Sequence, residues 1–348
     1  MKLLVLPGDG IGPEITGATL AVLAAANKRF GLELSVERRE IGLSSLAKEG
    51  TTLPAGTLER ARELDGVILG PLDQLRYPPA DKGGVNPSAL FRVKLDLYAN
   101  VRPARSRAGL GRAMDLVIMR ECTEGFYSDR NLHQGSGEFM PVPGVAMSMR
   151  KITAHACERI ARRAFELSRK RKKLVTAVHK ANVFRVTDGL YLDTVRAVAR
   201  EFPDVKLEEE IVDAMAAKLV RQPAHYDVVL ATNMYGDILS DLASELSGSL
   251  GLAGSILAGD SVCAAQAQHG SAPDIAGQDR ANPTSLILSA AMLLEWIGER
   301  KKVDRLVKAG RAIDAAVDKV LAKPESRTAD LGGRFGTRAF GEAVAEAL

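Results

Sequence analysis

The chain has 348 residues, of which 46% are hydrophobic and 26% are charged, and its formal net charge is +4 at pH 7. This composition is ordinary for a soluble globular protein, and the length is sufficient for two α/β lobes. The cysteines are three in number and widely spaced, which argues against a disulfide framework or a zinc site. The apolar runs are too short for a signal peptide or a membrane segment, so we expect a cytoplasmic protein.

The chain begins with a predicted strand at residues 3–6, and the turn PGDGIGPE at residues 7–14 leads into a helix that extends to about Phe30. Glycines in this turn allow a ligand to approach the backbone, although a plain tight turn explains them equally well. A second strand at residues 67–69 precedes a proline- and glycine-rich loop, and a helix follows at about residues 88–97.

Three arginines lie near the ends of predicted elements. Arg92 is on the helix at 88–97, Arg102 follows in an extended segment, and Arg120 comes directly after a strand at residues 116–119. The planar guanidinium fork matches two carboxylate oxygens at once, which indicates a small di- or tricarboxylic acid as ligand. A surface ion pair is the alternative for each arginine taken singly.

The next segments contain a proton donor and a basic region. Tyr127 lies on the segment that begins at Arg120, directly after the predicted strand. Its phenol is the available proton donor, and the alternative is a ring that packs in the core with its hydroxyl hydrogen-bonded. Residues 131–145 are typical of a long loop or short hairpin, which could form an arm. The basic run at 159–173 keeps apolar residues at helical spacing, so we interpret it as a surface helix rather than a nucleic-acid-binding segment.

A further strand at residues 174–178 is followed directly by His179 and Lys180. A lysine near a bound metal has a lowered pKa and can act as a general base, although a solvated charge is the common role of a single lysine. Helical segments are then predicted at about residues 190–201 and from Ile211 onward.

The stretch from Asp227 to Asp260 has the clearest pattern. Residues 228–231 form a buried strand, and a helix begins at Thr232 or Asn233 with an apolar stripe made by Ile238, Leu239, Leu242 and Leu246. Asp237 and Asp241 are four residues apart, so they project from one face and supply the hard oxygen ligands that Mg²⁺ or Mn²⁺ prefers. Two solvated acids on an exposed helix face are the alternative.

Two more helices are predicted at about residues 283–297 and 303–321, and they are expected to close the chain. Strands that alternate with helices predict an α/β fold with a largely parallel sheet covered on both faces. Ligands of such sheets bind at the carboxyl ends of the strands. Arg120, Lys180 and the segment 233–241 all lie near predicted strand ends, so one pocket can gather them.

Several motifs resemble those of the β-decarboxylating dehydrogenases, which act on isopropylmalate, isocitrate, homoisocitrate, tartrate or D-malate. The resemblance extends from the first glycine-rich turn to the carboxyl end of the chain. It rests on LDLYANVRP at 95–103, REcTEGfY at 120–127, HKAN at 179–182, VDAMA at 212–216, GDILSDLASELSGSLGLAGS at 236–255 and HGSAPDIAG at 269–277.

The resemblance implies a two-lobed, isopropylmalate dehydrogenase-like fold with a role for each matching residue. The large, cofactor-side lobe would comprise residues 1–98 and 248–348, and residues 99–247 would form the small lobe for dimerisation, metal binding and catalysis. Tyr127 and Lys180 would be the catalytic acid and base. The other implied residues are Arg92, Arg102, Arg120, Asn86 and Ser88 for the substrate, Asp213, Asp237 and Asp241 for Mg²⁺ or Mn²⁺, and His269, Gly270, Ser271, Ala272, Pro273, Asp274, Ile275 and Asn282 for the cofactor.

The resemblance also implies partners. Asp274 stands where NAD-dependent relatives carry an acid, which favours NAD over NADP because a carboxylate repels a 2′-phosphate. Family members form dimers, or dimers of dimers, so Lys180 and Asp213 would complete the site of a neighbouring subunit. A noncatalytic regulatory subunit and a nucleic-acid-binding protein are the two rival functions.

The residues before Arg92 should contact the variable substituent of the substrate. Isopropylmalate enzymes place paired leucines where this chain has Ser88 and Ala89, and isocitrate enzymes carry Ser and Asn where it has Asn86 and Ser88. Neither pattern is complete. We therefore expect a 3-carboxy-2-hydroxy acid with a small or polar substituent, without membrane or nucleic-acid partners.

Overall fold

A computed structural model describes residues 1–107 and 109–348, and it divides into two compact units. The first unit comprises Met1–Leu95, Arg107–Leu110 and Gly248–Leu348. The second unit comprises Asp96–Ser106 and Gly111–Ser247. Both units are of the α/β class, with mostly parallel strands covered by helices, as the alternating sequence pattern predicted.

The strands of the first unit follow the order β2-β1-β3-β12-β11, and all neighbouring pairs are parallel except β11 with β12. The strands are β1 (Lys2–Leu6), β2 (Ser35–Arg38), β3 (Gly66–Leu69), β11 (Ile256–Ala258) and β12 (Cys263–Gln266). The helices are α1 (Gly12–Phe30), α2 (Leu43–Glu49), α3 (Thr57–Glu63), α4 (Pro87–Lys94), α9 (Thr284–Lys301), α10 (Asp304–Leu321) and α11 (Thr337–Ala347).

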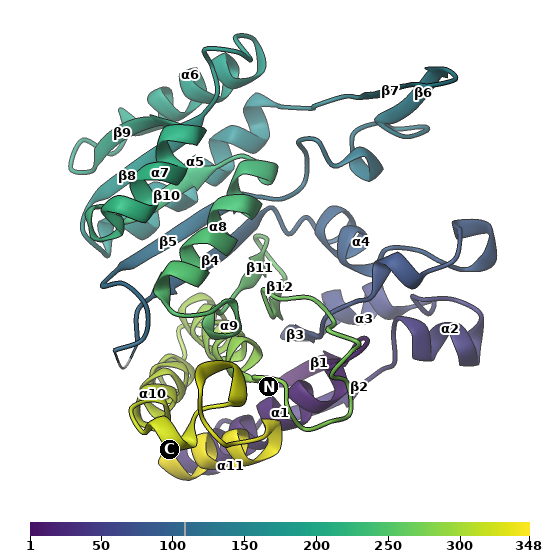
Figure 1. The fold of residues 1–348 in the computed structure, drawn as a ribbon, viewed down its shortest axis with the longest axis vertical. Helices are drawn as coiled ribbons and strands as arrows, with labels where there is room; N and C mark the ends of the chain where they lie inside the picture. Colours follow the sequence, from purple (N-terminus) through teal and green to yellow (C-terminus); the bar gives the residue numbers. More distant parts are fainter. Residues whose placement is uncertain (108) are drawn as a thin grey trace. The chain divides into compact units, whose positions relative to one another are not determined.

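The strands of the second unit follow the order β4-β5-β10-β8-β9, in which only β4 runs antiparallel to its neighbour. They are β4 (Ala99–Arg105), β5 (Asp115–Glu121), β8 (Leu174–His179), β9 (Lys206–Ile211) and β10 (Val228–Ala231). The helices α5 (Ala154–Arg169) and α6 (Thr187–Ala199) cover one face, and α7 (Val212–Arg221) and α8 (Asn233–Ser247) cover the other (Figure 1).

Alternation along the strands sorts the side chains of the second unit between these two faces. In β10, Val228 and Leu230 pack against α5 and α6, whereas Val229 and Ala231 pack against α7 and α8. In β5, Ile118 belongs to the α7 and α8 face. Successive strand residues point to opposite faces, so the side chain two residues further on is directed toward α8. That residue is Arg120.

A two-stranded hairpin of β6 (Glu138–Val142) and β7 (Val145–Ser148) extends away from the sheet and helices of the second unit (Figure 1). Its residues are exposed throughout both strands, including Phe139 at 43% and Met140 at 63%. The sequence predicted a long loop or a short hairpin for residues 131–145, and the structure has the hairpin, displaced by a few residues toward the C-terminus.

Several predicted elements are confirmed, and others were wrong in extent. The strands at 3–6, 67–69, 174–178 and 228–231 are present, and α8 begins at Asn233. The helix predicted at 88–97 ends at Lys94, because Asp96 adopts a left-handed conformation with φ of 50°. Arg120 lies inside β5 rather than after it, and α11 follows the two helices that were expected to close the chain.

The predicted apolar stripe of α8 needs one correction. Leu239 is fully buried, but Ile238 is 60% exposed. Neighbouring helix residues lie about 100° apart, so Ile238 and Leu239 cannot both point to the centre of the core. The buried side of the helix is formed instead around Tyr235, Leu239 and Ala243.

The basic run at 159–173 lies on α5 and the turn that follows it. Ile160 and Ala164 are buried, as the helical interpretation requires. The arginines on the outer side form ion pairs, for example Arg169 with Asp204 at 2.7 Å. These pairs neutralise much of the charge that a nucleic acid would need. Within the described residues, no helix is long and apolar enough to cross a membrane.

Candidate active site

The centre of the candidate site is the side chain of Arg120, which is 1% exposed. Its Nε and Nη2 donate to Asn233 Oδ1 at 3.0 and 2.6 Å, and Nη2 also donates to the Tyr127 hydroxyl at 2.8 Å. Its Nη1 donates to Asp237 Oδ1. Asn233 is in turn fixed, because its Nδ2 donates to the carbonyl oxygen of Glu124 at 2.7 Å. The guanidinium is therefore held in one orientation.

A second guanidinium converges on the same carboxylate. Arg102, which is 7% exposed, donates from Nη1 to Asp237 Oδ1 at 3.0 Å and to Ser240 Oγ at 2.7 Å. The same nitrogen is 3.6 Å from Asp241 Oδ1. Tyr127 donates its hydroxyl to the other oxygen of Asp237 at 2.6 Å. The two arginines and the phenol can thus hold one carboxylate from both sides.

Gly236 permits this arrangement because it leaves room for Arg120. A Cβ at Gly236 would lie 2.7 Å from Cγ and 2.8 Å from Cβ of Arg120. We expect Gly236→Ala to destabilise the protein by about 1–3 kcal/mol, because the buried guanidinium and α8 must move apart. Thermal unfolding would measure this effect. Gly189→Ala is the control, since a Cβ there meets no atom within 4 Å, and equal losses in both variants would contradict the steric explanation.

Lys180 and Asp213 form a separate pair. Lys180 follows the end of β8, Asp213 is in the first turn of α7, and Lys180 Nζ is 2.6 Å from Asp213 Oδ1. The hydrogen bond from Lys180 lowers the pKa of the Asp213 carboxyl. Asp213 is largely exposed, and Lys180 is partly buried. Both groups can therefore be reached from outside the second unit.

The two carboxylates of α8, Asp237 and Asp241, are accessible and have the oxygen donors that a divalent cation prefers. The side chain of Asp237 is 38% exposed and that of Asp241 is 55% exposed, and both offer hard oxygen donors from neighbouring turns of one helix face. Among the described residues of a single chain, however, no group of three or more His, Cys, Asp or Glu side chains is placed to hold a metal ion. Asp213 is therefore not gathered with Asp237 and Asp241 within one copy.

The predicted cofactor residues form a loop that packs against the N-terminal glycine turn of the first unit. The Ile11 N–H donates to the Ser271 carbonyl oxygen at 2.8 Å, and a Cβ at Gly10 would lie 1.9 Å from that oxygen. Glycine is thus required at residue 10, where φ is 57°. The glycine turn, where the sequence allows a ligand close to the backbone, therefore lies beside the predicted cofactor loop.

Within this loop, Asp274 is exposed and its carboxylate is available to a ligand. His269 is half-buried, and burial lowers its pKa, so its imidazole is neutral near pH 7. Asn282 donates to Asp330 at 3.0 Å and accepts from the Thr284 N–H at 3.0 Å at the start of α9. The remaining predicted cofactor residues, Gly270, Ala272, Pro273 and Ile275, connect these positions.

The predicted substrate residues of the first unit lie around α4. Asn86 caps this helix through a hydrogen bond from the Ala89 N–H to Asn86 Oδ1 at 3.0 Å. Its Nδ2 donates to Gln74 at 3.0 Å, which ties the preceding loop to the helix. Ser88 is buried, and Arg92 is partly buried in the last turn. Asn86 thus has a structural role besides the one expected from the resemblance.

A known protein family matches nearly the whole chain. The family described as isocitrate/isopropylmalate dehydrogenase matches residues 2–344. The chain belongs to the isocitrate/isopropylmalate dehydrogenase family.

Relatives within the family span nearly the whole chain. The isocitrate/homoisocitrate dehydrogenase of Thermus thermophilus is 42% identical and covers 100% of this chain and 98% of its own. The 3-isopropylmalate dehydrogenase of Moorella thermoacetica is 41% identical, with coverage of 95% and 93%. A crystal structure of isocitrate dehydrogenase from Methylococcus capsulatus superposes with a TM-score of 0.88 at 38% identity, with coverage of 99% and 98%.

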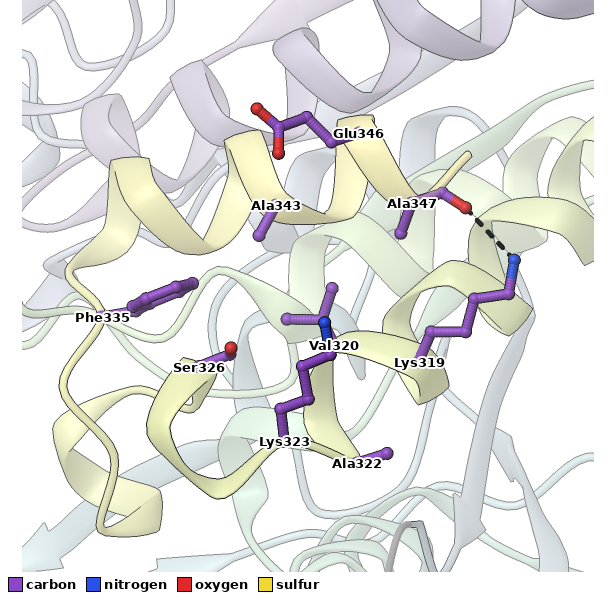
Figure 2. Close-up of a pocket in the computed structure, with 9 residues that line it drawn as sticks. All are labelled: Lys319, Val320, Ala322, Lys323, Ser326, Phe335, Ala343, Glu346 and Ala347. Carbon is purple, nitrogen blue, oxygen red and sulfur yellow. Dashed lines mark hydrogen bonds between the residues drawn. The ribbon is translucent and has the colours of Figure 1, made fainter.

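None of the predicted site residues is among the residues that line a groove of about 690 Å³ in the first unit (Figure 2). It is bordered by the end of α10 and by α11, where Lys319 donates to the Ala347 carbonyl oxygen at 3.2 Å. Its two lysines, Lys319 and Lys323, are exposed. We assign it no role in the dehydrogenase reaction.

Two residues of the site were missed at the level of sequence. Asn233 was assigned only as a helix start, yet it orients Arg120, and Ser240 orients Arg102. A signal for both exists in retrospect, because residues 233, 237 and 240 lie on one face of a helix that begins at 233. Polar side chains on the inner face of a helix next to a buried strand indicate a partner on that strand.

Proposed function

We propose that the protein is an NAD-dependent, divalent-metal-dependent dehydrogenase that oxidatively decarboxylates a 3-carboxy-2-hydroxy acid to a 2-oxo acid and CO₂. The observation that carries this proposal is the convergence of two buried guanidinium groups and one phenol on a single carboxylate. Family membership supports the oxidation of a hydroxy acid.

The chain's own residues supply binding and proton transfer in this reaction. Arg102 and Arg120 bind the carboxylates of the substrate, with Arg92 as the proposed third guanidinium. Lys180 takes the proton of the substrate hydroxyl as hydride leaves the carbon for NAD. Tyr127 returns a proton to the carbon from which CO₂ departs. A divalent cation held by Asp237, Asp241 and Asp213 would supply Lewis-acid stabilisation of the substrate oxygens.

The separation of Asp213 from the α8 aspartates supports a shared site. If Asp213 is the third ligand, it must come from a second copy of the chain, because one copy does not gather the three carboxylates. Ile238, directly after Asp237, is an exposed apolar residue on α8, as expected for a surface that a second copy covers. We therefore propose a homodimer, alone or within a tetramer, in which Lys180 and Asp213 serve the neighbouring subunit.

NAD is favoured over NADP by the exposed carboxylate of Asp274 in the proposed cofactor loop. A carboxylate accepts hydrogen bonds from ribose hydroxyl groups and repels a 2′-phosphate. The neutral imidazole of His269 adds no positive charge that would attract that phosphate. Both features point in the same direction.

The test is an absorbance assay of nicotinamide reduction. We expect NAD reduction with at least one acid among isopropylmalate, isocitrate, homoisocitrate, D-malate and tartrate in the presence of Mg²⁺ or Mn²⁺, and slower reduction of NADP. Detection of CO₂ distinguishes decarboxylation from simple oxidation. No reduction with any acid, by protein that is folded and loaded with metal, would reject the proposal in favour of a noncatalytic subunit.

A further inference from the structure

The side chain of Arg150 makes contact with three separate segments of the second unit that carry the proposed catalytic groups. It follows the β6–β7 hairpin in the chain, and only 6% of the side chain is exposed. None of the motifs that indicated the function includes Arg150. Its contacts nevertheless reach the neighbours of Tyr127, of Lys180 and of Asp237.

The first contact is with the segment that carries Lys180. Arg150 Nη1 donates to Oδ1 of Asp188, a carboxylate that is completely buried at the start of α6. The other oxygen, Asp188 Oδ2, accepts the backbone N–H of Lys180 at 2.6 Å. The carbonyl oxygen of Lys180 also accepts the N–H of Phe184 at 2.9 Å, which closes the segment into a compact loop.

The second contact is with the beginning of α8. Arg150 Nη2 donates to Thr232 Oγ1 at 3.0 Å, and Thr232 directly precedes Asn233, the residue that orients Arg120. The guanidinium also lies 5.0 Å from the ring centroid of Tyr235, which is two residues before Asp237. One planar cation thus contacts both the Lys180 loop and the α8 N-terminus.

The third contact is aromatic. The guanidinium lies 5.5 Å from the ring centroid of Phe126, which precedes Tyr127, and 5.3 Å from that of Phe184 in the Lys180 loop. The two rings pack edge to face with centroids 6.2 Å apart. Cation–π contacts of a desolvated guanidinium are stronger than those at a surface. The rings from three segments are therefore arranged around one side chain.

We propose that Arg150, together with Asp188, is a positioning residue that fixes the Lys180 loop relative to the α8 N-terminus and Tyr127. This inference rests on the proposed function for the roles of Lys180, Tyr127 and Asp237. Neither Arg150 nor Asp188 contacts the reacting groups directly. In the proposed dimer, Lys180 serves the active site of the neighbouring subunit, whereas Tyr127 and Asp237 serve the active site of their own chain. The contacts of Arg150 would therefore connect one active site with the other.

Substitutions at Arg150 and Asp188 test the proposal, because each residue forms hydrogen bonds to more than one segment and a similar side chain cannot form all of them. In Asp188→Asn, the amide has one acceptor oxygen, so it cannot accept from both the Lys180 N–H and Arg150 through separate oxygens as the carboxylate does. In Arg150→Lys, the ammonium keeps the charge but cannot bond Asp188 and Thr232 through one planar fork. Arg150→Met removes the hydrogen bonds of the guanidinium to Thr187, Asp188 and Thr232 and retains apolar bulk between the rings.

The kinetic test compares kcat and KM of these variants per folded active site. We expect kcat to fall about 10- to 100-fold, because small displacements of catalytic groups are costly. KM for the acid is expected to change by less than roughly threefold, because Arg102 and Arg120 keep their contacts. Arg150→Lys should fall between the wild type and Arg150→Met. Wild-type kcat in Asp188→Asn and Arg150→Met would overturn the proposal.

Hydrogen exchange gives a readout that does not depend on the reaction. We expect faster exchange at residues 180–188 in Asp188→Asn, and at both 180–188 and 232–236 in Arg150→Met. The matched control is Arg169→Met, which removes an arginine with an ion pair to Asp204 and a ring contact with Phe202 in the same unit. Unchanged exchange at both segments in Arg150→Met would overturn the proposal. Inactive wild-type protein would refute the proposed function instead.

Discussion

Lys180→Ala and Tyr127→Phe are each expected to lower kcat by about 10²- to 10⁴-fold, the usual contribution of a positioned acid or base. The substrate affinity should be largely retained, because the two buried arginines that are proposed to bind the substrate carboxylates remain in place. Steady-state kinetics at saturating acid and cofactor would measure both quantities. Near-wild-type turnover in either variant would remove the proposed role of that residue.

A matched control is available for Lys180. Lys218 on α7 forms an ion pair with Glu210, and it lies outside the proposed machinery. Lys218→Ala is therefore expected to retain wild-type turnover. A second readout is specific to Lys180, because its hydrogen bond lowers the pKa of Asp213. Without the lysine, the pKa of Asp213 should rise toward its ordinary value, and NMR titration would detect the change.

Mixing the two inactive variants tests whether the sites are shared. In a hybrid dimer, the Lys180→Ala chain still supplies Tyr127, and the Tyr127→Phe chain still supplies Lys180. If these groups act across the interface, one of the two sites is intact, and random reassembly should restore about a quarter of the wild-type activity. If both groups act within one chain, every site lacks one of them, and mixing should restore nothing.

The second large effect is expected at the α8 carboxylates. Asp241→Asn should weaken activation by Mg²⁺ or Mn²⁺ by more than the roughly 10- to 100-fold loss typical of outer-shell partners. Asp237→Asn should weaken activation by the metal to the same extent, and it should also lower the stability of the protein. Its carboxylate accepts from Arg102, Arg120 and Tyr127, so the neutral amide leaves buried guanidinium groups with a poorer partner. That loss should cost about 1–3 kcal/mol of stability.

The two aspartate variants therefore separate two roles. Metal titrations should show weakened activation in both variants. Thermal unfolding should show a larger decrease in Tm for Asp237→Asn than for Asp241→Asn. The substrate should also strengthen metal binding in the wild type, because in the proposed site its carboxylates would compete with Asp237 for the same two guanidinium groups. Full activity after thorough chelation would contradict the metal requirement, and equal stability of the two variants would contradict the structural role of Asp237.

Local sequence patterns were sufficient to predict a strand, a helix or the face of a helix where one short segment contained the whole pattern. The apolar run at 228–231 followed by a helical period predicted β10 and α8, and Asp237 and Asp241 were placed on one face by spacing alone. The strand β9 was missed because its sequence KLEEEI is mostly charged. It lies at the end of the strand order and has one strand neighbour, so these side chains remain partly accessible to water.

The sequence by itself determined the α/β class, the alternation of buried strands and helices, and the family to which the chain belongs. Only the tertiary structure decided which polar groups meet. Arg120 and Asp237 are 117 residues apart, yet their contact depends on strand alternation, on a helix that starts at Asn233, and on a glycine at residue 236. The role proposed for Arg150 could not be predicted from the sequence for the same reason. The aromatic rings and the oxygen acceptors that its guanidinium contacts come from segments that only the packing of the second unit brings together.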